Sequence, residues 1–224
     1  MIFAKSLMPM RRVMLMGLLS LLPALAMVQM ARAATPAETF VSENIDRGFA
    51  ILNNRSLSSS ARASQFQTFL EGLTDIDRIG KFTLGAARRA ASPQDIASFD
   101  AAFRSYAIEV YQSRLSQYSG QTLKVTGSTE RQAGDYVVST TLLDPAAKGS
   151  KQPLKVDFRV LNDKGRLVVI DVAVEGIWLA ITERDQFSAF LGQHNGSLSA
   201  LSTHLEQLTA QLKNGGGTAT ASQR

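Results

Sequence analysis

The stretch "PLKVDFRVLNDKGRLVVIDVAVEG", residues 153–176, decides the fold, because apolar residues occupy every second position along most of it. In its first half, charged residues separate four large apolar side chains: Leu154, Val156, Phe158 and Val160. A period of two is that of a β-strand, and it predicts a sheet with one apolar and one polar face. The "NDKG" at 162–165 predicts a tight turn. A second strand at 166–175 then runs antiparallel to the first.

The same period occurs twice upstream, at residues 123–125 and 135–144. Before these strands, apolar residues recur three or four positions apart, which is the spacing of amphipathic helices. The expected helices are 37–52, 61–73, 76–84 and 92–118. A block of helices and then a block of strands joined by short turns predicts an α+β fold. We expect N-terminal helices packed on a four-stranded antiparallel sheet, with C-terminal helices, in a single domain.

The helix at 92–118 has the clearest start signal, "SPQD". Ser92 can cap the first turn, Pro93 suits the first helical position, and Asp95 completes a short form of the capping box. Large apolar side chains fall into two stripes on opposite sides. They are Phe99, Phe103, Tyr106 and Val110 on one side, and Ile108, Tyr111, Leu115 and Tyr118 on the other. Such a helix is expected between two layers.

The first 33 residues have the layout of a secretory signal peptide. Basic residues precede an apolar run at 13–30, and Ala31-Arg32-Ala33 provides an A-x-A cleavage site. An uncleaved membrane anchor is the alternative, because about 18 apolar residues can just span a bilayer. We expect cleavage at 1–33 and export, a folded domain at 34–213, and a disordered tail at 214–224, which is rich in Gly, Ser, Thr and Ala. Without cysteine, such an exported domain is stabilised by its core alone.

The charge balance gives no reason to expect a nucleic-acid partner. The chain has 24 basic and 19 acidic residues. Residues 1–33 contain four of the basic residues and no acidic one, so the exported form has 20 against 19, a net charge of +1. Nucleic-acid binding needs a clustered basic face. Four arginines are candidates either for contact with a lipid phosphate or for ordinary solvated helix faces: Arg88, Arg89, Arg104 and Arg184.

The segment "DVAVEGIWLAITERDQF", residues 171–187, raises the question of catalysis, because it is rich in carboxylates. Asp171 and Glu175 on one strand face could flank a glycosidic bond, as paired carboxylates do in glycosidases. The other interpretation places both toward water and Glu183 and Asp185 in the first turns of a helix, where acids are favourable. The apolar stripe on the opposite strand face would then be Val168, Ile170, Val172 and Val174.

No motif predicts a cofactor or a metal. The sequence has no Walker loop, no dinucleotide fingerprint, no nucleophile elbow and no HExxH. His194 and His204 lie ten positions apart, and without cysteine they do not form a zinc pattern. We therefore expect no catalytic residues, no metal and no cofactor. The large apolar residues either fill the core or line a cavity for an apolar ligand.

Two segments resemble a known family: residues 84–125, "LGAARRAASPQDIASFDAAFRSYAIEVYQSRLSQYSGQTLKV", and residues 171–187. Both look like the MlaC-type family, the toluene-tolerance auxiliary proteins of lipid-transport ABC systems, and the resemblance extends over residues 35–212. The matching positions are Leu84-Gly85, Ser92-Pro93-Gln94, Phe99, Phe103, the segment 106–111, Tyr118-Ser119-Gly120, and Asp171 followed by Glu175-Gly176.

The resemblance implies a soluble periplasmic lipid carrier without catalytic activity. Such a carrier holds acyl chains between a curved antiparallel sheet and packed helices. It shuttles lipid between an inner-membrane ABC complex and an outer-membrane lipoprotein complex, in support of outer-membrane lipid asymmetry. Three sites depart from the family pattern: Ala86-Ala87 replace an aromatic pair, Ile170 an aromatic, and Trp178 a small serine. Since a related branch accompanies hopanoid pathways, the implied cargo is phospholipid or hopanoid.

We hypothesise that the apolar sheet face and one stripe of the long helix line the lipid cavity. The expected lining residues are Phe103, Tyr106, Val110, Val156, Phe158, Ile170 and Val172, with Ile177, Trp178 and Ile181 at the rim. The alternative is that these side chains fill an ordinary core. Two other functions also remain open: a non-lipid interaction module, and a periplasmic hydrolase that uses Asp171 and Glu175.

Overall fold

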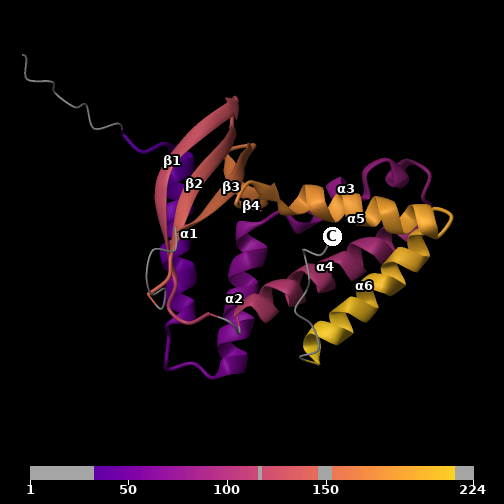
Figure 1. Cartoon of the computed structure of the whole chain (residues 1–224), viewed down its shortest axis with the longest axis horizontal. Helices are drawn as coiled ribbons and strands as arrows, with labels where there is room; N and C mark the ends of the chain where they lie inside the picture. The colour runs from indigo at the N-terminus through magenta and orange to yellow at the C-terminus, as the bar shows by residue number, and fades with distance from the viewer. Residues whose placement is uncertain (1–32, 116–117, 146–152, 215–224) are drawn as a thin grey trace, which may run out of the picture. The chain divides into compact units, whose positions relative to one another are not determined.

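The computed structural model describes residues 33–115, 118–145 and 153–214, drawn in colour in Figure 1. The predicted signal peptide and the predicted tail lie outside these residues, apart from Ala33 and Asn214. The described residues from Ala34 onward belong to one compact unit. Within the described ranges, no helix is both long enough and apolar enough to cross a membrane.

The helices begin and end close to the predicted positions. They are α1 (Pro36–Leu52), α2 (Ser59–Leu73), α3 (Ile76–Leu84), the 3₁₀ helix η1 (Gly85–Arg89), α4 (Pro93–Leu115), α5 (Leu179–Gln193) and α6 (Leu198–Lys213). The Ser92 hydroxyl accepts a hydrogen bond from the Asp95 backbone N–H at 3.1 Å, which confirms the start signal of α4. At α1, Thr35 and Glu38 form a complete capping box.

The strands form one antiparallel sheet in the order β1-β2-β3-β4-β5. They are β1 (Thr122–Gln132), β2 (Asp135–Leu143), β3 (Leu154–Asp163), β4 (Arg166–Val174) and β5 (Ile177–Trp178). The α+β class is confirmed, but the prediction of four strands is wrong. Strand β5 has two residues and is too short to show a period. It forms because Glu175 (φ 50°) and Gly176 (φ 81°) turn the chain sharply back, so that Ile177 pairs with Val174.

A β-bulge in β4 changes which residues share a face. Arg159 pairs with Asp171 and the next residue, Val160, pairs with Val169, so Ile170 has no partner in the ladder. The predicted apolar stripe of Val168, Ile170, Val172 and Val174 is therefore wrong at Val168, which pairs with Leu161 on the other face, and it is interrupted by the bulge at Ile170. Beyond the bulge, Val169 continues the face that carries Val172 and Val174. A strict period of two cannot reveal an inserted residue.

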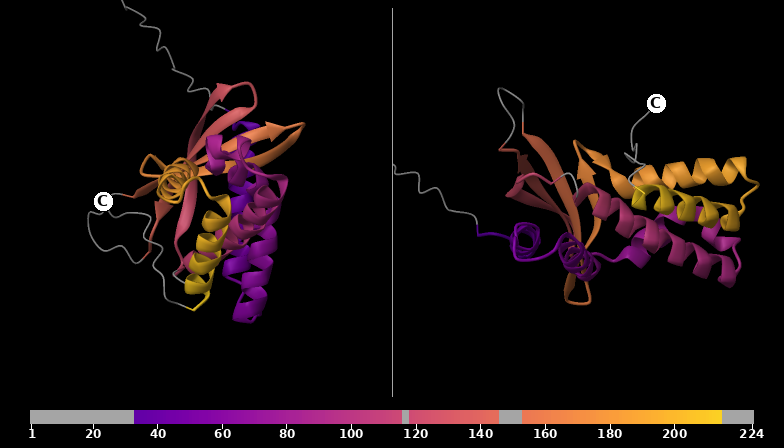
Figure 2. Two further views of the ribbon diagram at one scale, coloured as in Figure 1. Left: turned by 90° about the vertical axis from the view of Figure 1, so that its right-hand side faces the viewer. Right: turned by 90° about the horizontal axis from the view of Figure 1, so that it is seen from below.

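Most of the buried apolar side chains form two clusters. The sheet cluster joins Ala37 and Val41 of α1 to Val138, Val160 and Val169 of the sheet. The helical cluster joins α3, α4, α5 and α6. Its largest members are Ile76, Leu84, Phe99, Phe103, Phe187, Leu191, Leu198, Leu201 and Leu205. Figures 1 and 2 show α1 beside the sheet, while α5 leads away from the end of β4 to pack with α4 and α6.

The long helix α4 does not separate its two predicted stripes cleanly. Phe99 and Phe103 are buried in the helical cluster, as expected for members of one stripe. Ile108 was expected on the opposite side but packs against the same cluster. The neighbours α3, α5 and α6 surround a wider arc of α4 than a single stripe.

Candidate functional site

The apolar face of the sheet is buried unevenly along its strands. The register places Val156, Phe158 and Val160 of β3 on the same face as Val138 and Val172 of the neighbouring strands. Where α1 packs, Val138 and Val160 are fully buried. Toward the start of β3 the exposed fraction rises, to 9% at Val156 and 37% at Leu154. Cover by the described residues is therefore incomplete at this end of the face.

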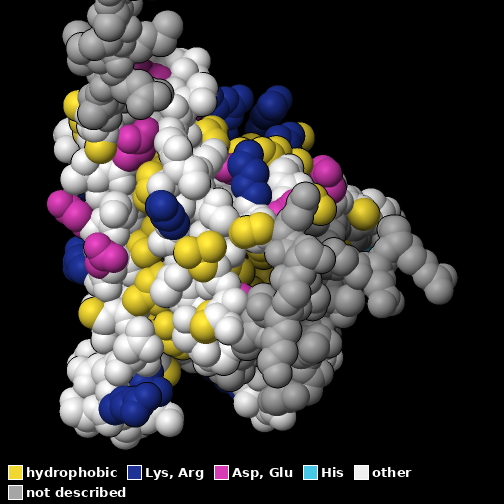
Figure 3. Space-filling model, turned by 60° about the vertical axis from the view of Figure 1, so that its left-hand side comes forward, with side chains coloured by type: hydrophobic (Ala, Val, Ile, Leu, Met, Phe, Trp, Pro, Cys, Tyr) yellow, Lys and Arg dark blue, Asp and Glu magenta, His cyan; other side chains and the backbone are white. Residues whose placement is uncertain are grey.

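The incompletely covered end carries large apolar side chains. Phe158 and Val172, which pair directly across β3 and β4, are both half-buried. On the same face, Leu142 and Val174 are also half-buried. Figure 3 shows hydrophobic side chains gathered in a band along a hollow on one side of the molecule. We call Leu142, Leu154, Val156, Phe158, Val172 and Val174 the apolar sheet face.

The structure brings together only part of the predicted lining. Val156, Phe158 and Val172 lie on this face, while Ile170 is half-buried within the bulge. The same alternation that predicted these residues also contained Leu154 and Val174, and it would have identified them. Leu142 was missed because "DYVVSTTLLD" mixes apolar and hydroxyl residues without a clear alternation.

The helix residues of the predicted lining lie mainly in the helical cluster. The Phe103 ring stacks on Phe99, with centroids 5.6 Å apart, and meets Phe187 edge-on at 6.2 Å. Tyr106 packs against the same cluster, and Val110 is half-buried near the end of α4. Phe103 is thus a core residue in this structure. Ligand contact by Phe103, Tyr106 and Val110 stays a prediction.

The predicted rim is exposed where β5 leads into α5. Ile177 is 57% exposed and Ile181 is 47% exposed, and Leu179 between them is exposed too. Trp178 is half-buried and precedes α5 as its N-cap, but its side chain makes no cap hydrogen bond. Because Ile177 pairs with Val174, this rim adjoins the incompletely covered end of the apolar sheet face.

Asp171 lies opposite the Val172 and Val174 side chains, as predicted, but it does not face open water. Its Oδ1 accepts hydrogen bonds from the backbone N–H groups of Val172, at 2.8 Å, and Ala180, at 2.9 Å. Burial raises the pKa of the Asp171 carboxyl, and the hydrogen bonds from the two amides oppose that rise. The carboxylate therefore joins β4 to the first turn of α5.

The other acids of this segment do not complete a catalytic pair with Asp171. Glu175 lies in the exposed turn between β4 and β5, and its Oε1 accepts the Lys155 backbone N–H. Burial raises the pKa of Glu183, and a hydrogen bond from Tyr106 opposes that rise. No acid lies in the first turn of α5, because the helix begins at Leu179 and Glu183 falls one turn later. The Tyr106–Glu183 pair was missed, since the residues belong to different helices.

The two histidines lie close together but not as metal ligands. The ring of Phe190 stacks on His194, with centroids 3.9 Å apart, and on His204, at 4.6 Å. The His194 Nδ1 also lies 2.8 Å from the Phe190 carbonyl oxygen. Among the described residues, no group of three or more His, Asp or Glu side chains could hold a metal ion.

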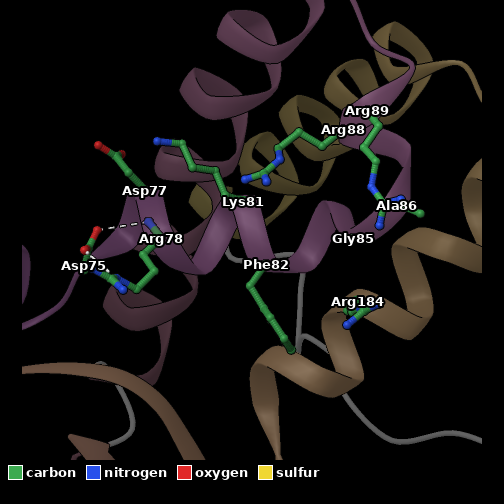
Figure 4. Close-up of a pocket in the computed structure, with 10 residues that line it drawn as sticks. All are labelled: Asp75, Asp77, Arg78, Lys81, Phe82, Gly85, Ala86, Arg88, Arg89 and Arg184. Carbon is green, nitrogen blue, oxygen red and sulfur yellow. Dashed lines mark hydrogen bonds and ion pairs between the residues drawn. The ribbon is translucent and has the colours of Figure 1, made fainter. Parts of the chain in front are cut away.

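A separate pocket of about 690 Å³ lies where α3, η1 and α5 meet, and Figure 4 shows its lining. Five cationic side chains line it: Arg78, Lys81, Arg88, Arg89 and Arg184. Of the four arginines singled out in the sequence, three therefore meet at one site, while Arg104 forms an ion pair with Asp77 at 2.7 Å. We call this the cationic pocket. Arg78 and Lys81 were missed, although both are basic and lie three positions apart on one helix.

Comparison with known proteins supplies the family. The family model described as "MlaC protein" matches residues 42–207. Among solved structures, the fold is similar to that of a phospholipid-binding protein from Ralstonia solanacearum, in complex with a phospholipid, with a TM-score of 0.66. The two sequences are 22% identical, and the match covers 80% of this chain and 99% of that chain. Because the family model spans well over half of the sequence, the chain belongs to the MlaC protein family.

Proposed function

We propose that this protein is a soluble periplasmic lipid carrier. It holds the acyl chains of a phospholipid, or the ring system of a hopanoid, against the apolar sheet face. It shuttles this lipid between an inner-membrane ABC transport complex and an outer-membrane lipoprotein complex. The observation that carries the proposal is the row of half-buried apolar side chains at one end of an otherwise buried sheet face. Family membership and the phospholipid named for the similar structure support it.

The incompletely covered face fits an apolar ligand on physical grounds. Phe158, Val172 and Val174 expose apolar area that a closed core would remove from water, at about 25 cal/mol per Å². An acyl chain laid along the face would remove that area instead. The exposed Ile177 and Ile181 then mark the side from which a chain enters, because they adjoin the less buried end of the same face.

Exchange of such a cargo is energetically feasible because membranes compete for it. About 30 buried methylenes contribute roughly 24 kcal/mol relative to water, which exceeds the strongest known non-covalent affinities of about 21 kcal/mol. In a bilayer, however, the same methylenes are already shielded from water. Transfer from bilayer to carrier is therefore nearly neutral in hydrophobic terms, and small differences at a partner complex are sufficient to set the direction.

The carboxylates give no support for hydrolysis. A retaining or inverting glycosidase needs two free carboxyl groups facing one bond. Asp171 accepts two backbone amides, and Glu175 accepts the backbone N–H of Lys155. Both side chains therefore serve the local structure, which favours binding and transport over catalysis as the function of this domain.

The decisive experiment is native mass spectrometry with lipid extraction. The full chain is expressed with its own N-terminal segment in a Gram-negative host, and the periplasmic product is purified without detergent. The mass of the protein reports whether residues 1–33 are removed. An additional mass that resolves into phospholipid or hopanoid is expected, and it identifies the cargo. A bare protein that also takes no lipid from vesicles would refute the proposal.

A further inference from the structure

The cationic pocket is lined mainly by charged side chains and contains none of the residues of the apolar sheet face. It is open to solvent and is built from Asp75 and the length of α3, from η1, and from Arg184 of α5. In Figure 4, Lys81, Arg88 and Arg89 project from α3 and η1, while Arg184 lies across from them on α5. Two segments far apart in sequence, residues 75–89 and α5, thus bring cations to one place.

The pocket has an excess of positive charge after internal ion pairs are counted. Its two acids are both engaged: Asp75 with Arg78 at 3.1 Å, and Asp77 with Arg104 at 2.7 Å. Arg78 also pairs with Asp163. In the described part of the chain, four pocket cations make no ion pair: Lys81, Arg88, Arg89 and Arg184. Like charges gathered in an open pocket favour an anionic ligand.

The backbone is shaped to admit Arg184 to the pocket. Gly85 has φ 55°, in the left-handed region that favours glycine. A Cβ atom at this position would lie 3.0 Å from the Arg184 Nε, so the glycine allows the guanidinium to approach the junction of α3 and η1. On its other side, the Arg184 guanidinium lies 5.3 Å from the centroid of the Phe82 ring. These contacts hold Arg184 at the pocket wall.

Apolar side chains at the pocket favour a lipid surface as the source of the anion. Phe82 lines the pocket and is exposed. Ile181 is exposed as well and lies three positions before Arg184, on the same face of α5. Arginine and lysine beside exposed aromatic and aliphatic side chains are typical of proteins that touch anionic membranes, where the cations meet phosphates and the apolar groups enter the interface. A soluble anion would make no apolar contact with Phe82 or Ile181.

We propose that the cationic pocket binds a phosphate group presented by an anionic phospholipid membrane, and so docks the protein on the membrane surface. Arg88, Arg89 and Arg184 supply the charge-assisted hydrogen bonds to the phosphate oxygens. Phe82 and Ile181 contact the surrounding interface. The site is distinct from the apolar sheet face and does not require that face to carry cargo.

The test is co-sedimentation of the exported protein with vesicles of phosphatidylglycerol and phosphatidylcholine, compared with phosphatidylcholine alone. The main variant is Arg88→Gln combined with Arg184→Gln, and its control is Arg55→Gln combined with Arg131→Gln, which removes the same charge at exposed positions outside the pocket. A second pair is Ala86→Glu, in the pocket, against Ala50→Glu on α1. Circular dichroism and thermal unfolding verify that each variant is folded.

Binding that depends on phosphatidylglycerol is expected for the parent chain and for both controls. Each charge removed from a membrane contact weakens partitioning about fivefold, so the double pocket variant loses about 25-fold. The controls stay within about twofold, because distant charges are screened at physiological salt. Ala86→Glu weakens binding about fivefold or more, while Ala50→Glu does not.

Three results would overturn the proposal. The first is equal binding to vesicles with and without phosphatidylglycerol, and the second is an equal loss of vesicle binding in the pocket and control variants. The third is a protein that binds inorganic phosphate in calorimetry but does not bind vesicles. The last would make the pocket a site for free phosphate. Native mass spectrometry of the same samples separates this proposal from the carrier function. A pocket variant that no longer binds vesicles but keeps its full lipid content would show that docking and cargo binding are separate. A parent chain that binds vesicles but contains no lipid would refute the carrier function and leave the docking proposal standing.

Discussion

Asp171 Oδ1 and the backbone N–H of Ala180 form a 2.9 Å hydrogen bond that ties strand β4 to the start of α5. The residue at the N-cap of that helix, Trp178, offers no side-chain acceptor. The Asp171 carboxylate, from the preceding strand, therefore caps the first turn of α5 in place of an N-cap side chain. It also places a negative charge near the positive end of the helix dipole. Asp171, which the sequence suggested as a catalytic carboxylate, thus stabilises the structure.

Replacing Asp171 should destabilise the fold without affecting any chemistry. Asp171→Ala leaves the amides of Val172 and Ala180 without this acceptor, so the free energy of unfolding should fall by about 1–3 kcal/mol. Asp171→Asn keeps an acceptor oxygen and should lose less. Urea denaturation measures both variants. Equal stability of Asp171→Ala and the parent chain would contradict the capping role.

The half-buried Glu183 should make stability depend on pH. Burial raises its folded-state pKa above the ordinary value of 4.5, despite the opposing hydrogen bond from Tyr106. In the window between the two pKa values, the folded state binds more protons than the unfolded state, so stability falls as pH rises. Glu183→Gln should flatten this fall above pH 4.5, as followed by urea denaturation at a series of pH values. Tyr106→Phe removes the opposing hydrogen bond and should steepen it. An unchanged profile in Glu183→Gln would exclude this residue as the source.

A charge on the apolar sheet face should expel lipid. Val172 is half-buried beside Phe158, so Val172→Asp would place a carboxylate where acyl chains are proposed to lie. Lipid recovered per protein should fall by at least about tenfold, since an unpaired buried charge costs several kcal/mol. Thr129→Asp, at an exposed position of β1, is the control and should retain full occupancy. Should Val172→Asp fail to fold, the uncharged Phe158→Ala tests the same face by altering the chain lengths bound. Unchanged cargo in folded variants of both residues would remove the face from the binding site.

The rim should matter for exchange and not for stability. Ile177 is 57% exposed, so Ile177→Ser should change the free energy of unfolding by less than about 0.5 kcal/mol. If chains enter beside β5, the same substitution should slow the transfer of a fluorescent lipid between protein and vesicles. Ala50→Ser on α1 provides an exposed comparison. Identical transfer rates for the two variants would place the entrance elsewhere.

The sequence predicted the first four helices and strands β2, β3 and β4 well because their signals are local. Strand β1 extends to Gln132, beyond the residues 123–125 that show the period. The capping residues of α4 and the alternation in β3 each act over a few positions. The misses involve information from distant residues. The bulge at Ile170 depends on how β4 pairs with β3, and the contact between Tyr106 and Glu183 depends on how α4 packs on α5. Phe103 could not be assigned to one cluster from its stripe alone, because a helical period shows which side is apolar and not what covers it.

The division of the buried side chains into a sheet cluster and a helical cluster has a mechanical consequence. No residue of the described chain is a member of both clusters. The elements that carry them are joined by hydrogen bonds from the Asp75 N–H to the Val169 carbonyl and from the Ala180 N–H to Asp171. A slight separation of the two clusters would increase the solvent exposure of side chains that are already half-buried, such as Phe158 and Val172. It would leave Val160 and Phe99 buried. We therefore expect that the two clusters can shift slightly relative to each other while each stays packed, which would change the internal volume without unfolding. Backbone amides in β3 and α4 should then exchange slowly both in the empty protein and in the protein bound to a bulkier lipid.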